Sequence, residues 1–144
     1  MKKHKGQVIV EFALILPLFL LMIFGMVYSG MLFYDYSTLS SVARSAAREA
    51  AITQTVTEND ATIIGHYYDS QNRVFISGLT TSLYLPKDDQ AFLIHIEENA
   101  SEADDIVVSI TMKLNASFPL IDVVLPDEYQ IKYHMRKDVN NSNT

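Results

Sequence analysis

A stretch without charged side chains, Phe12–Tyr34, constrains the fold of this chain more than any other feature of the sequence. About 20 consecutive apolar residues are enough for a helix to cross the hydrocarbon core of a bilayer. A soluble helix of this length needs a polar face, which the stretch lacks. A chain of 144 residues is also too short to bury such a helix on all sides. The sequence therefore predicts one transmembrane helix.

The charges that flank this helix predict its orientation. Lys2, Lys3 and Lys5 precede it, and the first charged residue after it is Asp35. Because positively charged flanks stay in the cytoplasm, we expect a single-pass protein of the cytoplasmic membrane with its N-terminus inside. An ordinary cleaved secretory signal is disfavoured, because its apolar region spans only about 7 to 15 residues. The chain is thus divided into a basic leader at 1–6, a transmembrane helix at 7–34, an extracytoplasmic domain at 35–138 and a disordered tail at 139–144.

The exported part of the chain is acidic. Three of the eleven Lys and Arg residues lie in the leader and one of the seventeen Asp and Glu residues lies in the helix, so residues 35–144 hold eight basic and sixteen acidic side chains. The resulting charge of −8 argues against nucleic acid and anionic lipid as partners of the domain. The chain contains no cysteine, which fits an exported protein without disulfides and equally a cytosolic one.

Glu11 is the one charged residue in the apolar region, and Val8–Val10 precede it. A carboxylate at the centre of a bilayer costs about 2.5 to 3.5 kcal/mol, and less near the headgroups. Two interpretations are open from the residues alone: Glu11 stays hydrated near the cytoplasmic headgroups, or it pairs with a cation when the helix packs against its neighbours. Pro17 does not argue against a membrane helix, because neighbouring groups can satisfy the carbonyl that it frees.

The helix is predicted to continue beyond the membrane to about Ala51. Small and apolar side chains recur there at spacings of three and four, which predicts close approach of another element. That element is either a neighbouring helix in a filament-like bundle or the chain's own domain, and both remain open. Arg44 and Arg48 lie one turn apart on an adjacent face, which we interpret as solvated. The small-residue stripe consists of Leu39, Val42, Ala43, Ala46, Ala47 and Ala50.

The remainder is predicted to form a short second helix followed by strands. Thr57 or Asn59 is the expected N-cap of this helix, which would end near Asn72, and Leu85–Asp89 is predicted as a loop with Pro86 in a turn. Alternation of apolar and polar residues predicts the strands Ala91–Glu98, Asp105–Leu114 and Glu128–Arg136.

The fold class that follows is α+β. Successive strands without helices between them favour an antiparallel sheet with one face against the helix and one face in water. We expect one long N-terminal transmembrane helix that continues into a small domain with a short second helix and an antiparallel sheet of about three to four strands.

Motifs for catalysis or cofactor binding are absent from the sequence, which has no phosphate-binding loop, no nucleophile elbow and no His-Glu-x-x-His. His95 and His134 fall on predicted strands and could approach each other in space, but surface positions are the simpler interpretation. We therefore expect no enzymatic activity, no cofactor, no metal and no small-molecule substrate.

The run Gly6-Gln7-Val8-Ile9-Val10-Glu11-Phe12 behind a basic leader resembles a class of prepilin signals. From Gly6 to Ala51 the sequence resembles, more narrowly, the TadE-like family, the pseudopilins of tight-adherence (Flp-type, type IVc) pili. This resemblance rests on Gly-Gln, Val-Glu-Phe, Leu-Pro, Phe33-Tyr34-Asp35-Tyr36 and the Ala-Arg-x-Ala-Ala-Arg pattern from Ala43 to Arg48. It is weaker at Ser109–Met112, Phe118–Leu120 and His134–Arg136, and no match is evident from Ile52 to about Asp105.

The resemblance implies processing at the N-terminus. A prepilin peptidase would cut between Gly6 and Gln7, and Glu11 with Phe12 would form the processing and assembly motif. Glu11 would neutralise the new ammonium of Gln7 on the same or an adjoining subunit. The residues that we assign to helix packing, in an assembly or on the chain's own domain, are Pro17, Ala43, Ala46, Ala47 and Ala50.

The same resemblance implies a non-enzymatic role in assembly of a Tad/Flp-type pilus, as an initiating, base or tip component. The implied partners are the lipid bilayer, the prepilin peptidase, other pilins and pseudopilins, and the pilus assembly platform, with no nucleic acid. The protein would lie in the inner membrane and could enter a surface pilus. The alternative is a permanently signal-anchored binding or sensor module, which predicts an uncut leader. A tethered enzyme is disfavoured, because no catalytic set of residues can be named.

Overall fold

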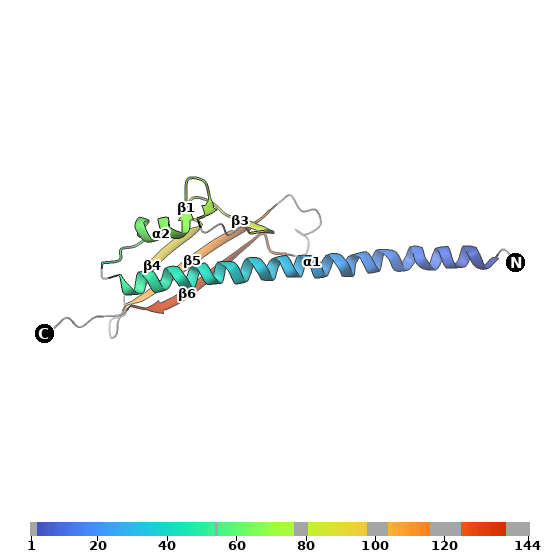
Figure 1. Ribbon diagram of the computed structural model, residues 1–144, viewed down its shortest axis with the longest axis horizontal. Coiled ribbons are helices and arrows are strands. Elements are labelled where there is room, and N and C mark those ends of the chain that lie inside the picture. Colours follow the sequence, from blue (N-terminus) through green and yellow to red (C-terminus); the bar gives the residue numbers. More distant parts are fainter. Residues whose placement is uncertain (1–2, 54, 77–80, 98–103, 116–124, 138–144) are drawn as a thin grey trace.

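The computed structural model describes residues 3–53, 55–76, 81–97, 104–115 and 125–137. One long helix, α1 (Lys3–Ile52), projects far beyond a small sheet domain, and only its C-terminal part lies on that domain (Figure 1). The predicted α+β class is confirmed. The tail at 139–144 and the segment Phe118–Leu120 lie outside the described residues. The other elements are α2 (Ala61–Tyr67), β1 (Tyr68–Asp69), β2 (Val74–Phe75), β3 (Tyr84–Pro86), β4 (Phe92–Glu97), β5 (Asp105–Leu114) and β6 (Glu128–Arg136).

Helix α1 is continuous over 50 residues, which corresponds to about 75 Å at 1.5 Å per residue. It therefore passes the predicted membrane boundary at Tyr34 without a break, as expected. At its C-terminal end the backbone N–H and the hydroxyl of Thr53 both donate to the carbonyl oxygen of Glu49, at 3.1 and 2.8 Å. These bonds satisfy one of the carbonyls that a helix end leaves without a partner.

Strand β5 is the centre of the main sheet, and all of its partners are antiparallel. β6 pairs with it from Asp105 to Lys113, which uses one edge of β5 along almost its full length. β4 and β3 share the other edge and pair with opposite ends of β5. β5 and β6 have the predicted bounds, and β4 begins at Phe92 rather than Ala91.

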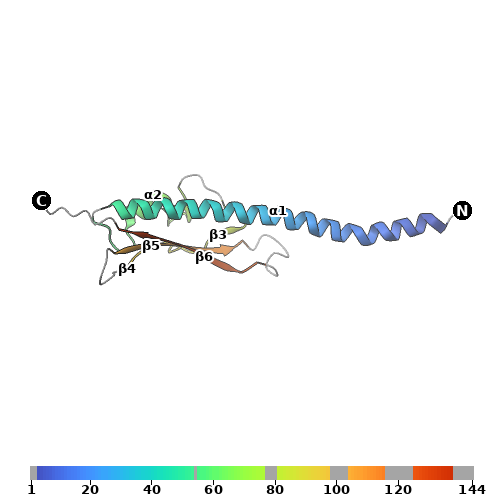
Figure 2. The same ribbon diagram turned by 90° about the horizontal axis from the view of Figure 1, so that it is seen from below.

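One face of the sheet packs against α1, and the two form separate layers in Figure 2. From β5 this face contributes four side chains with no exposed surface. They meet the apolar stripe of α1, and together the two sets form the centre of the core. The four β5 residues are Ile106, Val108, Ile110 and Met112.

The other face of the sheet is only partly open to water, in contrast to the prediction. Val107 and Ser109 of β5 are buried although they alternate with the core residues. β5 is the central strand, so Val107 lies in register between His95 of β4 and His134 of β6, whose longer side chains flank it. The expected wet alternation is present on the edge strand β6.

The N-cap of α2 is Asp60 rather than Thr57 or Asn59. The Asp60 carboxylate accepts from the backbone N–H groups of Thr62 and Ile63, at 3.0 and 3.4 Å. Asn59 has a left-handed backbone (φ 51°) and instead pairs with the outer edge of β4. Its N–H donates to the Ile94 carbonyl at 2.8 Å, and its side-chain oxygen accepts from the Ile94 N–H at 3.2 Å. This contact covers part of an edge that would otherwise be open to another strand.

The segment after α2 also differs from the prediction. The helix ends at Tyr67 instead of near Asn72, because Tyr68 and Asp69 form β1 and pair with β2. The Asp69 carboxylate accepts from the backbone N–H groups of Gln71 and Asn72, at 2.9 and 3.1 Å, and thereby orders the turn between the two strands.

Pro86 was expected in a turn, but it is the last residue of β3 and lies opposite Met112. Proline is tolerated in sheets on edge strands, where its missing N–H leaves no ladder bond unmade. β3 is such an edge strand. The chain then turns at Asp88, whose carboxylate accepts from the N–H of Gln90 at 2.9 Å.

Candidate functional site

The predicted cleavage site lies at the free end of α1. Gly6 and Gln7 are exposed and belong to the first turns of the helix, which begins at Lys3. A Cβ built on Gly6 meets no atom within 4 Å, so the backbone here is open on the side where a protease would approach. Glycine also costs about 1 kcal/mol in a helix relative to alanine, which makes this end of α1 easier to unwind.

Gln7 and Glu11 lie on the same side of α1, one turn apart, as residues at i and i+4 do. Together with Gly6, Val10 and Leu14 they line one shallow groove along the helix. Among the described side chains, no hydrogen bond or ion pair involves the Glu11 carboxylate. An ammonium at position 7 would be its nearest possible cation on the same chain.

The N-terminal half of α1, Gly6–Val27, is not buried against the described part of the domain. Every residue in it is exposed, and we call it the bare half. It spans about 33 Å at 1.5 Å per residue, close to the roughly 30 Å of a bilayer core. α1 is long and apolar enough to cross a membrane, and it is the single helix of the described chain that is. The bare half is curved in Figure 2 and contains Pro17, which lacks the N–H for the bond to the carbonyl four residues earlier.

The C-terminal half of α1, Tyr28–Ile52, packs on the domain, and we call it the packed half. Tyr28, Met31 and Leu32 are partly buried against the core. The alanines of the predicted packing motif are deeper, and none of the four has any exposed surface. They face the chain's own sheet, which is one of the two alternatives that the sequence left open. The four are Ala43, Ala46, Ala47 and Ala50.

Asp35 is a buried structural residue whose contact the sequence analysis missed. Its side chain is completely buried (0% exposed). The carboxylate accepts from the backbone N–H groups of Ser82, Leu83 and Tyr84, at 2.7, 2.8 and 3.2 Å. A buried charge is tolerated only when other groups pair with it or hydrogen-bond to it, and these three donors meet that requirement. The contact fixes α1 to the start of β3 close to the boundary between the bare and packed halves.

Two tyrosines border this carboxylate. Tyr84 and Tyr129 pack edge to face, with ring centroids 4.4 Å apart. Burial raises the pKa of both, and the negative charge of Asp35 raises each further. The Tyr84 hydroxyl donates to the Pro126 carbonyl at 2.9 Å, whereas the buried Tyr129 hydroxyl has no hydrogen-bond partner among the described residues. A buried polar group without a hydrogen bond is costly in such surroundings. The three hydrogen bonds to Asp35 spare its carboxylate this cost.

A sequence signal for Asp35 exists. The apolar stripe of α1 can be extended toward the N-terminus from Leu39 by steps of three and four, through Asp35 to Leu32 and Tyr28. Each of these positions is at least partly buried against the core or lies within it. A charged residue at a position of the stripe predicts a buried and satisfied carboxylate.

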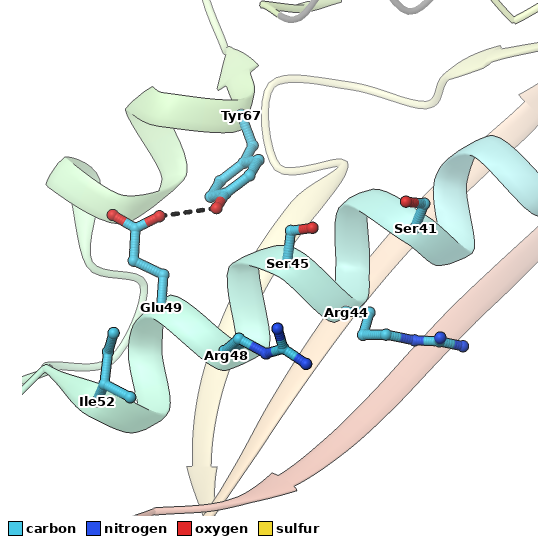
Figure 3. A pocket seen from close by; sticks show the side chains of 7 residues that line it. All are labelled: Ser41, Arg44, Ser45, Arg48, Glu49, Ile52 and Tyr67. Atoms are coloured by element: carbon cyan, nitrogen blue, oxygen red, sulfur yellow. Dashed lines mark hydrogen bonds between the residues drawn. The ribbon is translucent and has the colours of Figure 1, made fainter.

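A second polar surface lies on the exposed side of the packed half (Figure 3). Glu49 reaches from α1 to α2, where its two oxygens contact the His66 Nδ1 at 2.7 Å and the Tyr67 hydroxyl at 2.8 Å. Burial and then this hydrogen bond raise the pKa of Tyr67 to about 12. Beside this contact is an open cavity of about 340 Å³, which we call the arginine groove. It is lined by Ser41, Arg44, Ser45, Arg48, Glu49, Ile52 and Tyr67.

The histidines do not come together. His95 and His134 lie on opposite sides of Val107, on β4 and β6. His95 contacts Glu58 at 3.1 Å, and both partners are about half exposed. Within the described ranges no three His, Cys, Asp or Glu side chains are grouped as they would be to hold a metal ion.

Comparison with known proteins gives a family match for the N-terminal part of the chain. Residues 6–48 match the family model described as TadE-like protein. The matched range begins at the predicted cleavage glycine and contains Glu11, the whole bare half, Asp35 and both arginines of the groove. No curated protein and no solved structure matches the chain. Over the segment that runs from Gly6 to Arg48, the chain is similar to the TadE-like family, and this segment is less than a third of its length.

Proposed function

We propose that this TadE-like protein is a pseudopilin of a Tad/Flp-type pilus. It is inserted in the cytoplasmic membrane with its N-terminus inside, is cut between Gly6 and Gln7 by a prepilin peptidase, and then joins the pilus as an initiating, base or tip component. The observation that carries this proposal is the bare half of α1. It is an apolar helix that the described part of the domain leaves uncovered, and the predicted cleavage motif lies at its free end.

The bare half requires a partner in any aqueous setting. Large apolar side chains project from all of its sides, and each costs about 1.5 to 3 kcal/mol to leave in water. Lipid can cover such a helix, and so can the helices of other pilins in a bundle. A protein that passes from the membrane into a filament needs both coverings in turn. The side chains that project include Val8, Ile9, Phe12, Leu14, Leu18, Phe19, Leu21 and Met26.

The position of Glu11 is consistent with transfer of the helix from the membrane into a filament. Counted back from Val27, a bilayer core of about 30 Å takes about 20 residues, so Glu11 lies just inside the cytoplasmic boundary of the core. An uncompensated carboxylate is unfavourable there. Cleavage after Gly6 creates an ammonium on Gln7, one turn from Glu11 on the same side of the helix. Pairing of the two charges, within one subunit or between neighbours, lowers the cost of moving Glu11 into an apolar bundle.

The domain has a structural role in this proposal. Its described surface offers the sheet, the α2 side and the arginine groove as contact surfaces, and no catalytic group has been identified on it. The acidic charge of the exported part favours partners with basic or polar surfaces and disfavours nucleic acid.

The test is the N-terminus of the protein in membranes. The chain is expressed with and without a Tad-type prepilin peptidase, and its first residue and intact mass are determined. We expect a peptidase-dependent product that begins at Gln7 and that Gly6→Ala abolishes. A Cβ at position 6 meets no described atom within 4 Å, so loss of cleavage in this variant reflects the peptidase and not misfolding.

A second variant separates processing from assembly. Glu11→Gln is expected to be cut but to enter filaments poorly, because the ammonium of Gln7 then lacks its counter-charge. If the leader stays intact while a known substrate is cut in the same membranes, the pseudopilin proposal fails. The protein would then be a permanently anchored binding or sensor module.

A further inference from the structure

The arginine groove contains a like-charged pair that has no ion pair within the described part of the chain. Arg44 and Arg48 are four residues apart on α1, and both are exposed. Like charges at this spacing destabilise a helix. Neither arginine has an acidic residue three or four positions away on either side. The two arginines therefore destabilise the helix locally. Residues that lower local stability in this way are expected at functional positions.

The acidic residue nearest to this pair is directed elsewhere. Glu49 follows Arg48 directly, but its carboxylate contacts His66 and Tyr67 of α2. In Figure 3 the Glu49 side chain points to α2, whereas Arg44 and Arg48 extend along the other side of the groove. Among the described residues, Arg48 has no ion pair or hydrogen bond with a side chain.

The helix dipole does not account for the arginines. Cations stabilise a helix mainly within its last turn, and the last turn of α1, which ends at Ile52, contains no basic residue. Arg44 and Arg48 lie earlier, so their positions need another explanation.

The groove is prepared for a carboxylate ligand. The Arg44 guanidinium is held over the Tyr133 ring, 5.6 Å from its centroid, so less conformational freedom is lost when it binds. Guanidinium groups bind carboxylates through two parallel hydrogen bonds. The hydroxyls of Ser41 and Ser45 lie beside them, and the cavity of about 340 Å³ leaves room for side chains of a partner.

The position of the groove disfavours lipid headgroups as its ligand. At 1.5 Å per residue, Arg44 lies about 15 Å and Arg48 about 21 Å along the helix beyond the predicted membrane boundary at Tyr34. The headgroup layer on each side of a bilayer is only about 5 to 8 Å thick. A protein partner reaches the groove without this restriction, and acidic side chains outnumber basic ones two to one in the exported part of this chain.

We propose that the arginine groove binds an acidic segment of a neighbouring subunit, whose carboxylates pair with Arg44 and Arg48. This inference rests on the proposed function, in which the packed half of α1 lies among other pilin-like subunits. It assigns a partner-binding role to two arginines that the sequence analysis interpreted as solvated.

The test is photo-crosslinking of the full-length protein in cells that assemble the pilus. A photo-reactive amino acid is placed at Ser45, inside the groove, and in a matched control at Gln71, an exposed residue on the β1–β2 turn. We expect an adduct from position 45 and none from position 71, and the crosslinked peptide of the neighbour should contain Asp or Glu. The double variant Arg44→Glu, Arg48→Glu should lower the yield at least roughly tenfold.

Two further variants make the result specific for charge. Arg44→Lys with Arg48→Lys retains the charge without the planar donors and should give an intermediate yield. Reversal of the mapped acidic residue to Lys should restore crosslinking to the double Glu variant. Restoration also shows that the double Glu variant is folded.

The inference is overturned if position 45 gives no adduct above the control, an adduct with lipid alone, or an adduct that charge reversal does not change. Cleavage at Gly6 is measured in the same cells. Normal cleavage without the adduct refutes the groove inference alone, whereas an intact leader refutes the proposed function.

Discussion

The two halves of α1 form one continuous helix but bury their side chains in opposite ways. The bare half has large apolar residues on all sides, and the described part of the domain covers none of them. The packed half has small residues on one side, all buried against the sheet, and exposed polar residues such as Ser45 and Arg48 on the other. A helix that is apolar all round needs lipid or other helices, whereas a helix with one apolar stripe belongs to a domain. The change occurs between Val27 and Asp35.

The domain is therefore built on the packed half of α1, whereas the bare half is suited to lipid or to a bundle of other helices. In the proposed arrangement Asp35 lies close to the boundary between the two environments, and its three hydrogen bonds join α1 to the start of β3. If this account is correct, substitutions in the packed half change the stability of the domain and substitutions in the bare half do not.

The largest effect is expected for Asp35→Ala. The substitution leaves the N–H groups of Ser82, Leu83 and Tyr84 without their acceptor, and unsatisfied buried donors cost about 1 to 3 kcal/mol each. We expect the free energy of unfolding to fall by roughly 3 to 5 kcal/mol. The measurement is denaturant unfolding of the full chain in detergent, followed by the near-ultraviolet circular dichroism of tyrosine, since the chain has eight tyrosines and no tryptophan.

The matched control for this variant is Asp88→Ala. Asp88 is an exposed carboxylate that accepts from one backbone N–H, that of Gln90, so its loss should change the unfolding free energy far less. Equal effects of the two variants would show that Asp35 is not the contact that joins α1 to the domain.

A smaller effect is expected when an alanine of the stripe is enlarged. Ala46 has no exposed surface, and overpacking of a tight core costs about 1 to 3 kcal/mol. Ala46→Leu should therefore destabilise the domain by that amount, whereas Ala13→Leu, an exposed position in the bare half, should leave its unfolding curve unchanged. The same denaturant measurement applies, and a large effect of Ala13→Leu on the domain would break the division between the halves.

The smallest effect at neutral pH concerns the tyrosines of the domain. Burial raises the pKa of Tyr67 and Tyr68 from 10.0 to about 12, and it also raises the pKa of Tyr84 and Tyr129. A folded-state pKa above the unfolded value means that the folded domain holds more protons, so its stability is constant below about pH 10 and falls as the pH rises toward about 12. Tyrosinate absorbance and circular dichroism should change together over this interval. Titration of these tyrosines at their ordinary pKa, without unfolding, would contradict their burial.

Local patterns in the sequence predicted much of this structure. The strict alternation in Asp105–Leu114 and Glu128–Arg136 predicted the bounds of β5 and β6, because each strand keeps one apolar face against the helix. The spacing of small residues likewise predicted the continuation of α1. These features depend on neighbours in the sequence, and they need no knowledge of distant contacts.

Most of the errors concern contacts between residues far apart in the chain, and the pairing of β1 with β2 is the exception. Asp35 accepts hydrogen bonds from residues 47 to 49 positions away, and no local pattern announces those donors. Asn59 lost its predicted capping role because it pairs with Ile94 on the edge of β4. Tyr68, which was predicted to be helical, instead belongs to β1, because it pairs with Phe75 of β2. For the candidate site, the motif at Gly6–Phe12 was visible in the sequence, whereas the groove required the placement of α2 beside α1.

The central claim, that the bare half lies in the membrane and the packed half outside the cytoplasm, is tested most directly by cysteine labelling. The chain has no cysteine, so single variants Leu18→Cys and Ser45→Cys can be treated with a membrane-impermeant maleimide on cells that lack other pilus proteins. Both side chains are exposed in the isolated chain. We predict that Ser45→Cys is labelled from outside and that Leu18→Cys is labelled only after detergent is added. Labelling of Leu18→Cys in intact cells, or protection of Ser45→Cys until the cells are opened, would contradict the account.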